Sequence, residues 1–357
     1  MPYCFVKALE KRGIAVECVD IKPDAWIDSF WNSTVKRFIN LLRRNNDYYF
    51  ERSWLAECIS YHKIRRAVRG NMNAELCIFT SFSYWNKFDS RPSLLLCDWT
   101  YEMLITERFH RQPCFIEKRY VLQQKKAICN ASLVVSLFKN SAETMKLRFP
   151  SANICWPGIN VINNLYDGVI DDCLIGLKKI NDIVLFVGKP AYLSGAKMLA
   201  EAMLKIWESH PSMELHCIGI TQEQLGADDE RIVCHGYLRK DVPEEREMYY
   251  GLLCRSRVFC NPTPEWAGFS STVEAMYFYT PVVVSNYDNF VEEFGHDIEF
   301  GRYNVSSDGG SLSKNLLAVI DNPDFTTMCL CAHETVRNYT WDEYVQRVED
   351  FCNHTRL

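Results

Sequence analysis

The stretch that decides the fold is "SRVFCNPTPEWAGFSSTVEAMYFYTPVVVSNY", residues 256–287. It begins with a short apolar run, passes through a loop that contains two prolines and a carboxylate, and ends on a second apolar run at 281–284. Short continuous apolar runs are typical of strands buried on both faces. Between them, Ser270, Ser271 and Thr272 suit the start of a helix. We therefore predict a strand–loop–helix–strand unit, with ligand binding beyond the carboxyl end of its first strand.

The same alternation of apolar runs and helical segments extends along the whole chain. Helical periodicity is clear at residues 196–210 and 244–256. This rhythm predicts α/β domains with doubly wound parallel sheets. The runs expected to form strands are residues 14–20, 75–82, 93–99, 132–138, 152–159, 182–189, 213–220, 231–238, 256–263 and 281–287.

The pattern occurs twice, with a break at residues 161–181. We therefore expect an N-terminal domain at 1–165, a second domain at 166–340, and a closing helix at 341–357 that packs back toward the first domain. Residues 1–13 have the pattern of a helix that leads into the run 14–20. A doubly wound domain normally begins with a strand before that helix, so the first domain is expected to lack its first strand.

Composition narrows the class of protein. A chain of 357 residues suits two domains. No apolar run approaches the roughly 20 residues that a spanning helix needs. The 16 cysteines include no C-x-x-C pair and no zinc-site spacing. We expect reduced thiols in a cytoplasmic protein that holds no metal.

Charge is divided unevenly between the two halves. Residues 1–180 contain 26 Lys and Arg against 18 Asp and Glu, a net charge of +8, whereas residues 181–357 contain 14 against 27, a net charge of −13. The split favours an anionic partner for the basic half. We expect no nucleic acid among the partners. A chance difference in charge between solvated surfaces is the alternative. Clustered Lys and Arg at 35–46 and 63–70 predict peripheral contact with an anionic membrane, or else form ordinary solvated helix faces.

Several segments, in order and correctly spaced, carry a family resemblance. They include "FVGKPAYLSGAKMLAEAM" (186–203), "IVCHGYL" (232–238), the stretch 256–295 and "YTWDEYVQRVEDF" (339–351), with 94–104 and 117–161 in the first half. Together they resemble the GT-B glycosyltransferases, specifically the retaining family 4 group. The resemblance implies two Rossmann-like domains that face a central cleft. It also implies a donor domain in the second half and an acceptor domain in the first.

The implied activity is transfer of a sugar from a nucleotide-diphosphate sugar to a hydroxyl acceptor, with retention of anomeric configuration. The acceptor would be a cell-envelope or lipid-linked saccharide, met in the cytoplasm or at the inner face of the membrane. No cofactor is implied. The sequence contains no D-x-D motif, which fits a mechanism without a metal. The alternatives are a non-catalytic protein derived from this fold, or another GT-B enzyme such as a nucleotide-sugar epimerase.

The resemblance gives the loop after residue 261 two roles. Glu274 matches the carboxylate that holds the ribose hydroxyls, and a carboxylate can accept two hydroxyl protons. The carboxylate for the transferred sugar is displaced by one residue, so either Glu265 reaches the sugar or Trp266 stacks on it. The other donor-binding residues expected on this loop are Gly268, Phe269, Ser270 and Ser271. A merely well-capped helix is the alternative.

A second group of donor-binding residues is expected near residue 188. Gly188 and Lys189 match the family's segment after the first strand of the donor domain. Ser194 stands where the family has a second lysine, and Lys197, one helical turn further, is its candidate substitute or else a surface lysine. Positive charge here would stabilise a departing diphosphate.

In the first domain, Asp98 follows a predicted strand. The resemblance makes Asp98 the candidate for contact with the transferred sugar or the acceptor hydroxyl. An aspartate that caps a turn is the alternative.

Overall fold

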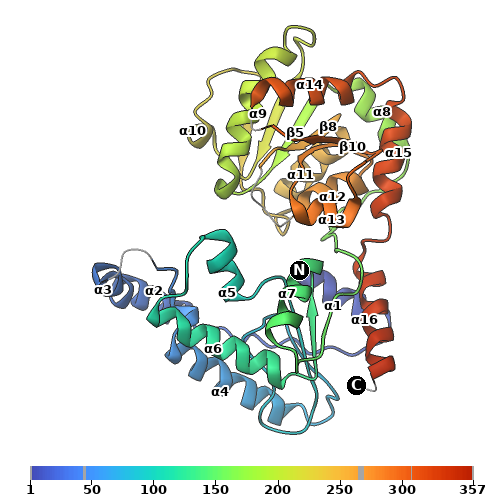
Figure 1. Ribbon diagram of the computed structural model, residues 1–357. Coiled ribbons are helices and arrows are strands. Elements are labelled where there is room, and N and C mark those ends of the chain that lie inside the picture. The colour runs from blue at the N-terminus through green and yellow to red at the C-terminus, as the bar shows by residue number, and fades with distance from the viewer. Residues whose placement is uncertain (1, 43–45, 264–268, 307, 356–357) are drawn as a thin grey trace. The chain divides into compact units, whose positions relative to one another are not determined.

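The computed structural model describes residues 2–42, 46–263, 269–306 and 308–355. The chain divides into two compact units: unit 1 contains residues 1–160 and 341–357, and unit 2 contains residues 161–340. Each unit is an α/β structure built on a parallel sheet (Figure 1). The predicted fold class of two doubly wound parallel sheets is therefore confirmed.

The sheet of unit 1 has four parallel strands in the order β1-β2-β3-β4. Leu95 and Val134, at its centre, are fully buried, as continuous apolar strands require. The strands are β1 (Cys77–Phe79), β2 (Ser93–Cys97), β3 (Leu133–Ser136) and β4 (Ile154–Cys155). The helices are α1 (Pro2–Lys11), α2 (Ala25–Ser33), α3 (Val35–Leu42), α4 (Trp54–Gly70), α5 (Tyr101–Met103), α6 (Phe115–Asn130), α7 (Lys139–Arg148) and α16 (Trp341–Thr355), with a 3₁₀ turn at Phe50–Arg52 and a π turn at Leu104–Arg108.

The two ends of the chain meet in unit 1. The ring of Phe5 in α1 lies 5.4 Å from the ring of Trp341 in α16. Tyr344 of α16 is fully buried, and its hydroxyl donates to the carbonyl of Ser136 at the end of β3. The last helix is therefore part of the core of unit 1.

Unit 2 has a sheet of six parallel strands in the order β10-β9-β8-β5-β6-β7. Its strands are β5 (Ile183–Val187), β6 (Glu214–Ile218), β7 (Ile232–Gly236), β8 (Val258–Asn261), β9 (Val282–Ser285) and β10 (Gly301–Asn304). Its helices are α8 (Cys173–Ile180), α9 (Leu193–Ile206), α10 (Gln222–Leu225), α11 (Pro243–Arg255), α12 (Ser270–Tyr277), α13 (Asp288–Phe294), α14 (Gly309–Ile320) and α15 (Phe325–Val336), with a 3₁₀ turn at Pro190–Tyr192.

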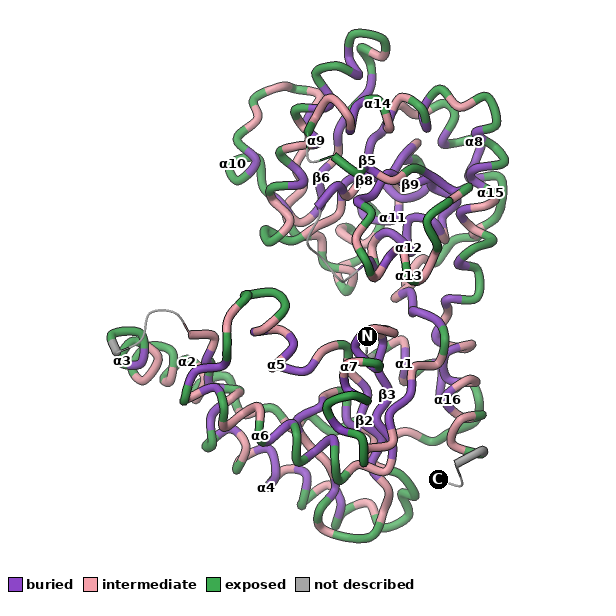
Figure 2. The backbone as a smooth tube through the Cα atoms, in the orientation of Figure 1, coloured by how far each residue is buried: buried purple, intermediate pink, exposed green. Residues whose placement is uncertain are grey.

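Helices cover the sheet of unit 2 on both faces, and Figure 2 shows its strands as largely buried. On one face α9 lies beside α14 (Figure 1). Leu199, Met203 and Ile206 recur on one side of α9 and are fully buried, which is the periodicity of an amphipathic helix. With Leu312 and Leu316 of α14 they form one cluster with the strands.

Two strand predictions require correction. Residues 14–20 form no strand: Ile14 and Val19 are 39% and 44% exposed. A strand needs a hydrogen-bonded neighbour, and this segment pairs with neither sheet. Conversely, β10 was not expected, because "GRYN" lacks an apolar run. It is an edge strand that pairs only with β9, Gly301 standing opposite Val282.

In the part of the chain that the structure describes, every helix is too short or too polar to cross a bilayer.

Candidate functional site

The strand order of unit 2 reverses between β5 and β8. β5 has β6 on one side and β8 on the other, so the connections that follow these strands leave in opposite directions. A crevice forms outside the carboxyl ends of parallel strands at such a point, and ligands of open α/β sheets bind there. Residues 188–197 follow β5, and residues 262–274 follow β8. In the described part of these segments, Gly195 packs on Thr263 and the Ser271 hydroxyl contacts the Val187 carbonyl, so the ends of β5 and β8 lie together.

Glycines let the backbone pack closely where β5 ends. The Gly188 N–H donates to the Ile218 carbonyl at 2.9 Å. A side chain at residue 188 would approach the Phe186 ring to within 2.7 Å. Gly219, with a φ of +91°, packs directly on the Gly188 carbonyl. Lys189 follows this tight crossing and is exposed.

The start of α9 has no side-chain cap. Tyr192 occupies the N-cap position and makes no side-chain hydrogen bond to the helix. The 3₁₀ turn before α9 satisfies the first of its N–H groups, because the Leu193 N–H donates to the Pro190 carbonyl. The start of a helix carries the positive end of its dipole, which favours an anion. Ser194 is exposed in this first turn. Gly195 is buried so closely against Thr263 that a Cβ there would collide with the threonine hydroxyl.

Thr263 brings the end of β8 to the same place. It is 7% exposed, and its hydroxyl oxygen has no hydrogen-bond partner among the described residues. A buried hydroxyl without a partner is costly unless a ligand or water satisfies it. Lys189 and Lys197 are both exposed, and within the described chain neither pairs with a carboxylate. The positive end of the α9 dipole, together with two lysines that pair with no carboxylate in the described chain, makes this edge suited to a phosphate.

The helix after β8 begins at Ser270, which corrects the expected capping. Phe269 stands at the N-cap position, and α12 has no side-chain cap. Ser270 is exposed, whereas the Ser271 hydroxyl points to the Val187 carbonyl at 3.4 Å. Phe269 is 3% exposed, with its ring 5.4 Å from that of Phe290. The Phe269 side chain therefore contributes to packing, and Ser270 stands at the surface.

Glu265, Trp266 and Gly268 lie outside the described residues.

Glu274 lies on α12 within a buried polar network. Its side chain is 7% exposed and forms an ion pair with Lys240 through Oε1. The Tyr249 hydroxyl donates to Oε2 at 2.7 Å, and the Tyr250 hydroxyl lies 3.4 Å from Oε1. Burial, together with the Glu274 carboxylate, holds the pKa of Tyr249 well above its usual range, so the hydroxyl remains a donor.

No pattern in the sequence points to these three partners. Lys240 lies 34 residues before Glu274, and the two tyrosines lie 25 and 24 residues before it. The Lys240 ammonium also reaches the Asn163 carbonyl at 3.4 Å, and the Tyr250 hydroxyl accepts from the Leu165 N–H at 2.7 Å. A pair of tyrosines on a helix, read alone, indicates packing.

Asp98 follows β2 in unit 1 and is exposed. Its Oδ1 accepts from the Trp99 N–H at 2.8 Å and from the Cys97 thiol at 3.2 Å. Burial, reinforced by the Asp98 charge, raises the pKa of Cys97, so that thiol remains a neutral donor. Thr100, rather than Asp98, caps the following helix by accepting from the Met103 N–H. Asp98 thus has its second carboxylate oxygen at the surface.

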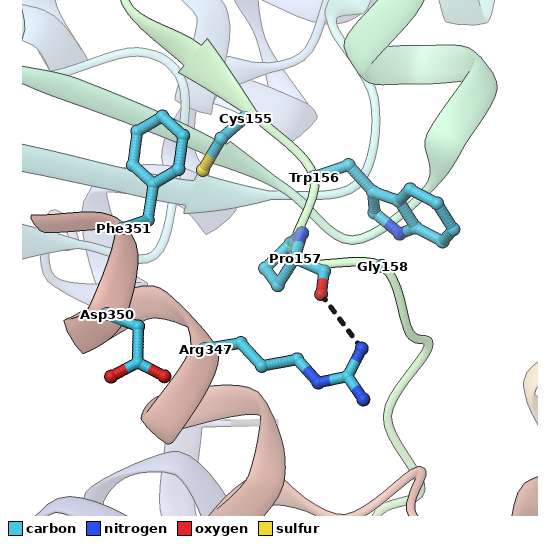
Figure 3. Close-up of a pocket in the computed structure, with 7 residues that line it drawn as sticks. All are labelled: Cys155, Trp156, Pro157, Gly158, Arg347, Asp350 and Phe351. Atoms are coloured by element: carbon cyan, nitrogen blue, oxygen red, sulfur yellow. Dashed lines mark hydrogen bonds between the residues drawn. The ribbon is translucent and has the colours of Figure 1, made fainter. Parts of the chain in front are cut away.

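Unit 1 also contains a cavity of about 410 Å³ between the end of β4 and α16 (Figure 3). The Arg347 guanidinium reaches the Pro157 carbonyl at 3.3 Å and the Glu343 carboxylate at 2.8 Å. Burial raises the pKa of the Cys155 thiol in its wall to about 12. The lining residues are Cys155, Trp156, Pro157, Gly158, Arg347, Asp350 and Phe351. None of the residues expected to bind donor or acceptor lines it.

Comparison with known proteins gives a family match for part of the chain and shows its fold. Residues 181–322 match the family of glycosyl transferases group 1. No curated protein matches the chain in sequence. Among solved structures, HepE of Anabaena in complex with UDP and glucose is similar over 98% of this chain and 88% of that chain, with a TM-score of 0.58 and 16% identity.

Two further structures share the architecture. Sucrose-phosphate synthase of Thermosynechococcus elongatus matches 83% of this chain and 78% of that chain, with a TM-score of 0.58 and 18% identity. The pneumococcal O-GlcNAc transferase GtfA, in complex with UDP and GlcNAc, matches 82% and 60%, with a TM-score of 0.53 and 10% identity. At these identities the likeness establishes the GT-B fold.

Proposed function

We propose that this chain is a glycosyltransferase that moves a sugar from a nucleotide-diphosphate sugar to a hydroxyl acceptor, because residues 181–322 match the glycosyl transferases group 1 family. One observation carries the proposal: the N-terminal end of α9 lies with Lys189 at the strand-order reversal, where Gly195 of α9 packs directly on Thr263. That arrangement suits a diphosphate group. We further propose retention of anomeric configuration and a mechanism without a metal, as the sequence resemblance implies.

The chemistry required of these residues is mainly electrostatic. When the glycosidic bond breaks, the sugar gains oxocarbenium character and the diphosphate leaves with additional negative charge. Lys189 and the N–H groups of α9 would stabilise that charge. Glu274 would hold the ribose, and Glu265 or Trp266 would contact the sugar. Ser194 offers a hydroxyl where the family has a second lysine, so Lys197 is the remaining source of positive charge.

Uridine nucleotides are the first donors to test. HepE and GtfA were both solved with UDP, which supports a UDP-sugar for a chain of the same fold. Release of nucleoside diphosphate from a panel of UDP-, GDP- and ADP-sugars tests the activity. A protein that binds these nucleotides and releases none would instead be the non-catalytic relative that the sequence left open.

We predict that Lys189→Ala weakens nucleoside-diphosphate binding by about 1.5–3 kcal/mol, roughly 10- to 150-fold, because it removes a charge-assisted phosphate contact. Titration calorimetry measures this loss. Lys205→Ala is the matched control, since Lys205 is exposed in the last turn of α9. Equal affinities in the wild type and both variants would make Lys189 an ordinary surface residue.

We also propose peripheral contact with an anionic membrane through α2 and α3. No residue of α2 is buried, and its large apolar side chains Trp26 and Phe30 are 70% and 62% exposed. In α3, Phe38 and Leu41 are 63% and 83% exposed. Exposed apolar residues of this size mark interaction surfaces, and tryptophan favours the membrane interface. Residues 25–70 contain nine Lys and Arg against four Asp and Glu, which suits acidic headgroups.

We expect cosedimentation with vesicles that contain phosphatidylserine, and less of it as salt rises, because screening weakens the attraction. Changing Trp26 and Phe30 together to serine should reduce binding at every salt concentration. Tyr237→Ser, a change of a 72% exposed aromatic residue in unit 2, should not. No binding at low salt would refute membrane contact. Self-association lost with the same double variant would point to a protein interface instead.

A further inference from the structure

Three titratable side chains form a hydrogen-bonded chain at one edge of the sheet of unit 2. β7 is the edge strand and pairs only with β6. Nδ1 of His216 in β6 lies 2.9 Å from Nε2 of His235 in β7, and Nε2 of His216 lies 2.8 Å from the Glu214 carboxylate. The two ring planes are within 12° of each other and their centres are 5.2 Å apart. The contacting nitrogens therefore face each other nearly in plane, which is the geometry of an N–H···N hydrogen bond.

Glu214 fixes which ring nitrogens carry protons. A carboxylate only accepts, so the proton of the neutral His216 ring lies on Nε2, and its Nδ1 accepts from the His235 Nε2–H. One added proton is tolerated, because a charged His216 ring then donates from Nδ1 to His235 while Glu214 neutralises the charge. A second proton leaves an N–H group on both facing nitrogens. The hydrogen bond between the strands is then lost, and two positive charges remain in contact.

The surroundings set the pH at which the second proton binds. Burial, and after it the neighbouring His216, lower the pKa of His235 below its ordinary value of 6.5. On the far side of β6, β5 places the apolar Leu185 opposite His216. The remaining carboxylates of α11, Glu244 and Glu247, are exposed. The other charged groups next to β7 and along α11 and its approach are paired with one another: Arg231 with Asp229, Arg239 with Glu245, Arg246 with Asp167, and Lys240 with Glu274.

The direction of the pH effect follows from this lowered pKa. The unfolded chain binds the proton of His235 at a higher pH than the folded chain does. The contribution of the hydrogen bond to stability is therefore complete above pH 6.5 and is lost as the pH falls through the pKa of the folded state.

From this arrangement we propose that Glu214, His216 and His235 form a pH-sensitive latch, which holds β7 on β6 and opens in acid. β7 ends at Gly236, whose carbonyl accepts from the Gly219 N–H at 2.6 Å, and Gly219 packs directly on the Gly188 carbonyl. Opening of the latch thus loosens the edge of the sheet that leads to residues 188–197. The latch does not depend on the proposed function.

Hydrogen exchange of the full chain, followed by mass spectrometry from pH 8 to pH 5 and corrected for intrinsic exchange rates, tests the latch. In the wild type, peptides of β7 should lose about tenfold in protection between pH 7 and pH 5, relative to peptides of β5, because one hydrogen bond is lost. His235→Gln retains an N–H donor toward His216 but takes no charge, so its β7 peptides should follow β5 at every pH. His62→Gln, a change of an exposed histidine on α4, should behave as the wild type.

Two outcomes of this experiment would overturn the latch. One is a wild type whose β7 protection follows β5 from pH 7 to pH 5, and the other is an equal acid loss in the wild type and His235→Gln. Nitrogen-15 NMR of the imidazoles is an independent measurement: at pH 8 both His216 and His235 should carry their proton on Nε2. A proton on Nδ1 of His216 at that pH would contradict the hydrogen-bonded chain. Thermal unfolding at pH 8 confirms that His235→Gln is folded.

Discussion

Glu274→Gln should weaken nucleoside-diphosphate binding by about 1.5–3 kcal/mol, roughly 10- to 150-fold, while turnover at saturating donor changes little. The reason is that a ribose contact is made equally in the ground state and the transition state, so its loss appears in KM rather than in kcat. The same change should lower the free energy of unfolding by about 1–3 kcal/mol, because Lys240, which is 23% exposed, loses its counter-charge and Tyr249 loses its charged acceptor.

Steady-state kinetics and urea titration measure the two effects separately. Glu292→Gln, a change of an exposed carboxylate on α13, is a suitable control for loss of one negative charge. Changes at Glu265 or Trp266, which the sequence assigns to the sugar, should instead act on turnover. If Glu274→Gln left both affinity and turnover intact, the assignment of this loop to the donor would be wrong.

The second large effect is expected at Lys178, which is fully buried. α8 turns Leu174, Ile175 and Lys178 inward. The ammonium donates to the carbonyls of Leu253 and Cys254 at 2.8 and 3.1 Å, in the last turn of α11. It also donates to the Thr280 hydroxyl at 2.8 Å and lies 3.4 Å from the Ser256 carbonyl. The Lys178 ammonium therefore caps the C-terminal end of α11, because the last carbonyls of a helix have no N–H partner within it.

Lys178→Met should lower the free energy of unfolding by about 3 kcal/mol, because methionine fills similar space and leaves buried carbonyls without their donor. The adjacent Lys179 is exposed, so Lys179→Met controls for the loss of one lysine and should change little. Urea titrations of both variants give the difference. A Lys178→Met protein as stable as the wild type would show that the carbonyls find other partners.

The effect should depend on pH. Burial lowers the pKa of Lys178 to about 7, from 10.5 in the unfolded chain. Between these values the unfolded state binds a proton that the folded state has released, so the contribution of Lys178 to stability rises with pH through this window. Below pH 7 both states are protonated and the cost of burying the charge is fully present. The difference between the wild type and Lys178→Met should therefore grow from pH 7 to pH 10.

Apolar runs predicted most of both sheets because parallel strands are buried on both faces, as "DIVLFVGK" and "PVVVSNY" illustrate. The same rule failed where strand formation depends on hydrogen bonding to a neighbouring strand. Residues 14–20 have the apolar pattern but no neighbouring strand, and β10 has a neighbour but no apolar pattern. At the site, the family resemblance assigns Gly188 and Glu274 to the donor, and these roles stay predictions. Lys240, Tyr249 and Tyr250 were missed because their contacts with Glu274 depend on how α11 and the segment before it pack on α12.

Unit 1 is discontinuous, and this has a consequence for biosynthesis. Unit 2 is continuous from residue 161 to 340, so it can fold as soon as that stretch has left the ribosome. Unit 1 is synthesised first but requires α16, whose Trp341 and Tyr344 pack against α1 and β3. The earlier part of the chain must therefore wait, with the apolar face of α1 uncovered, until the last helix emerges. Chaperones should act on this nascent N-terminal segment throughout the translation of unit 2.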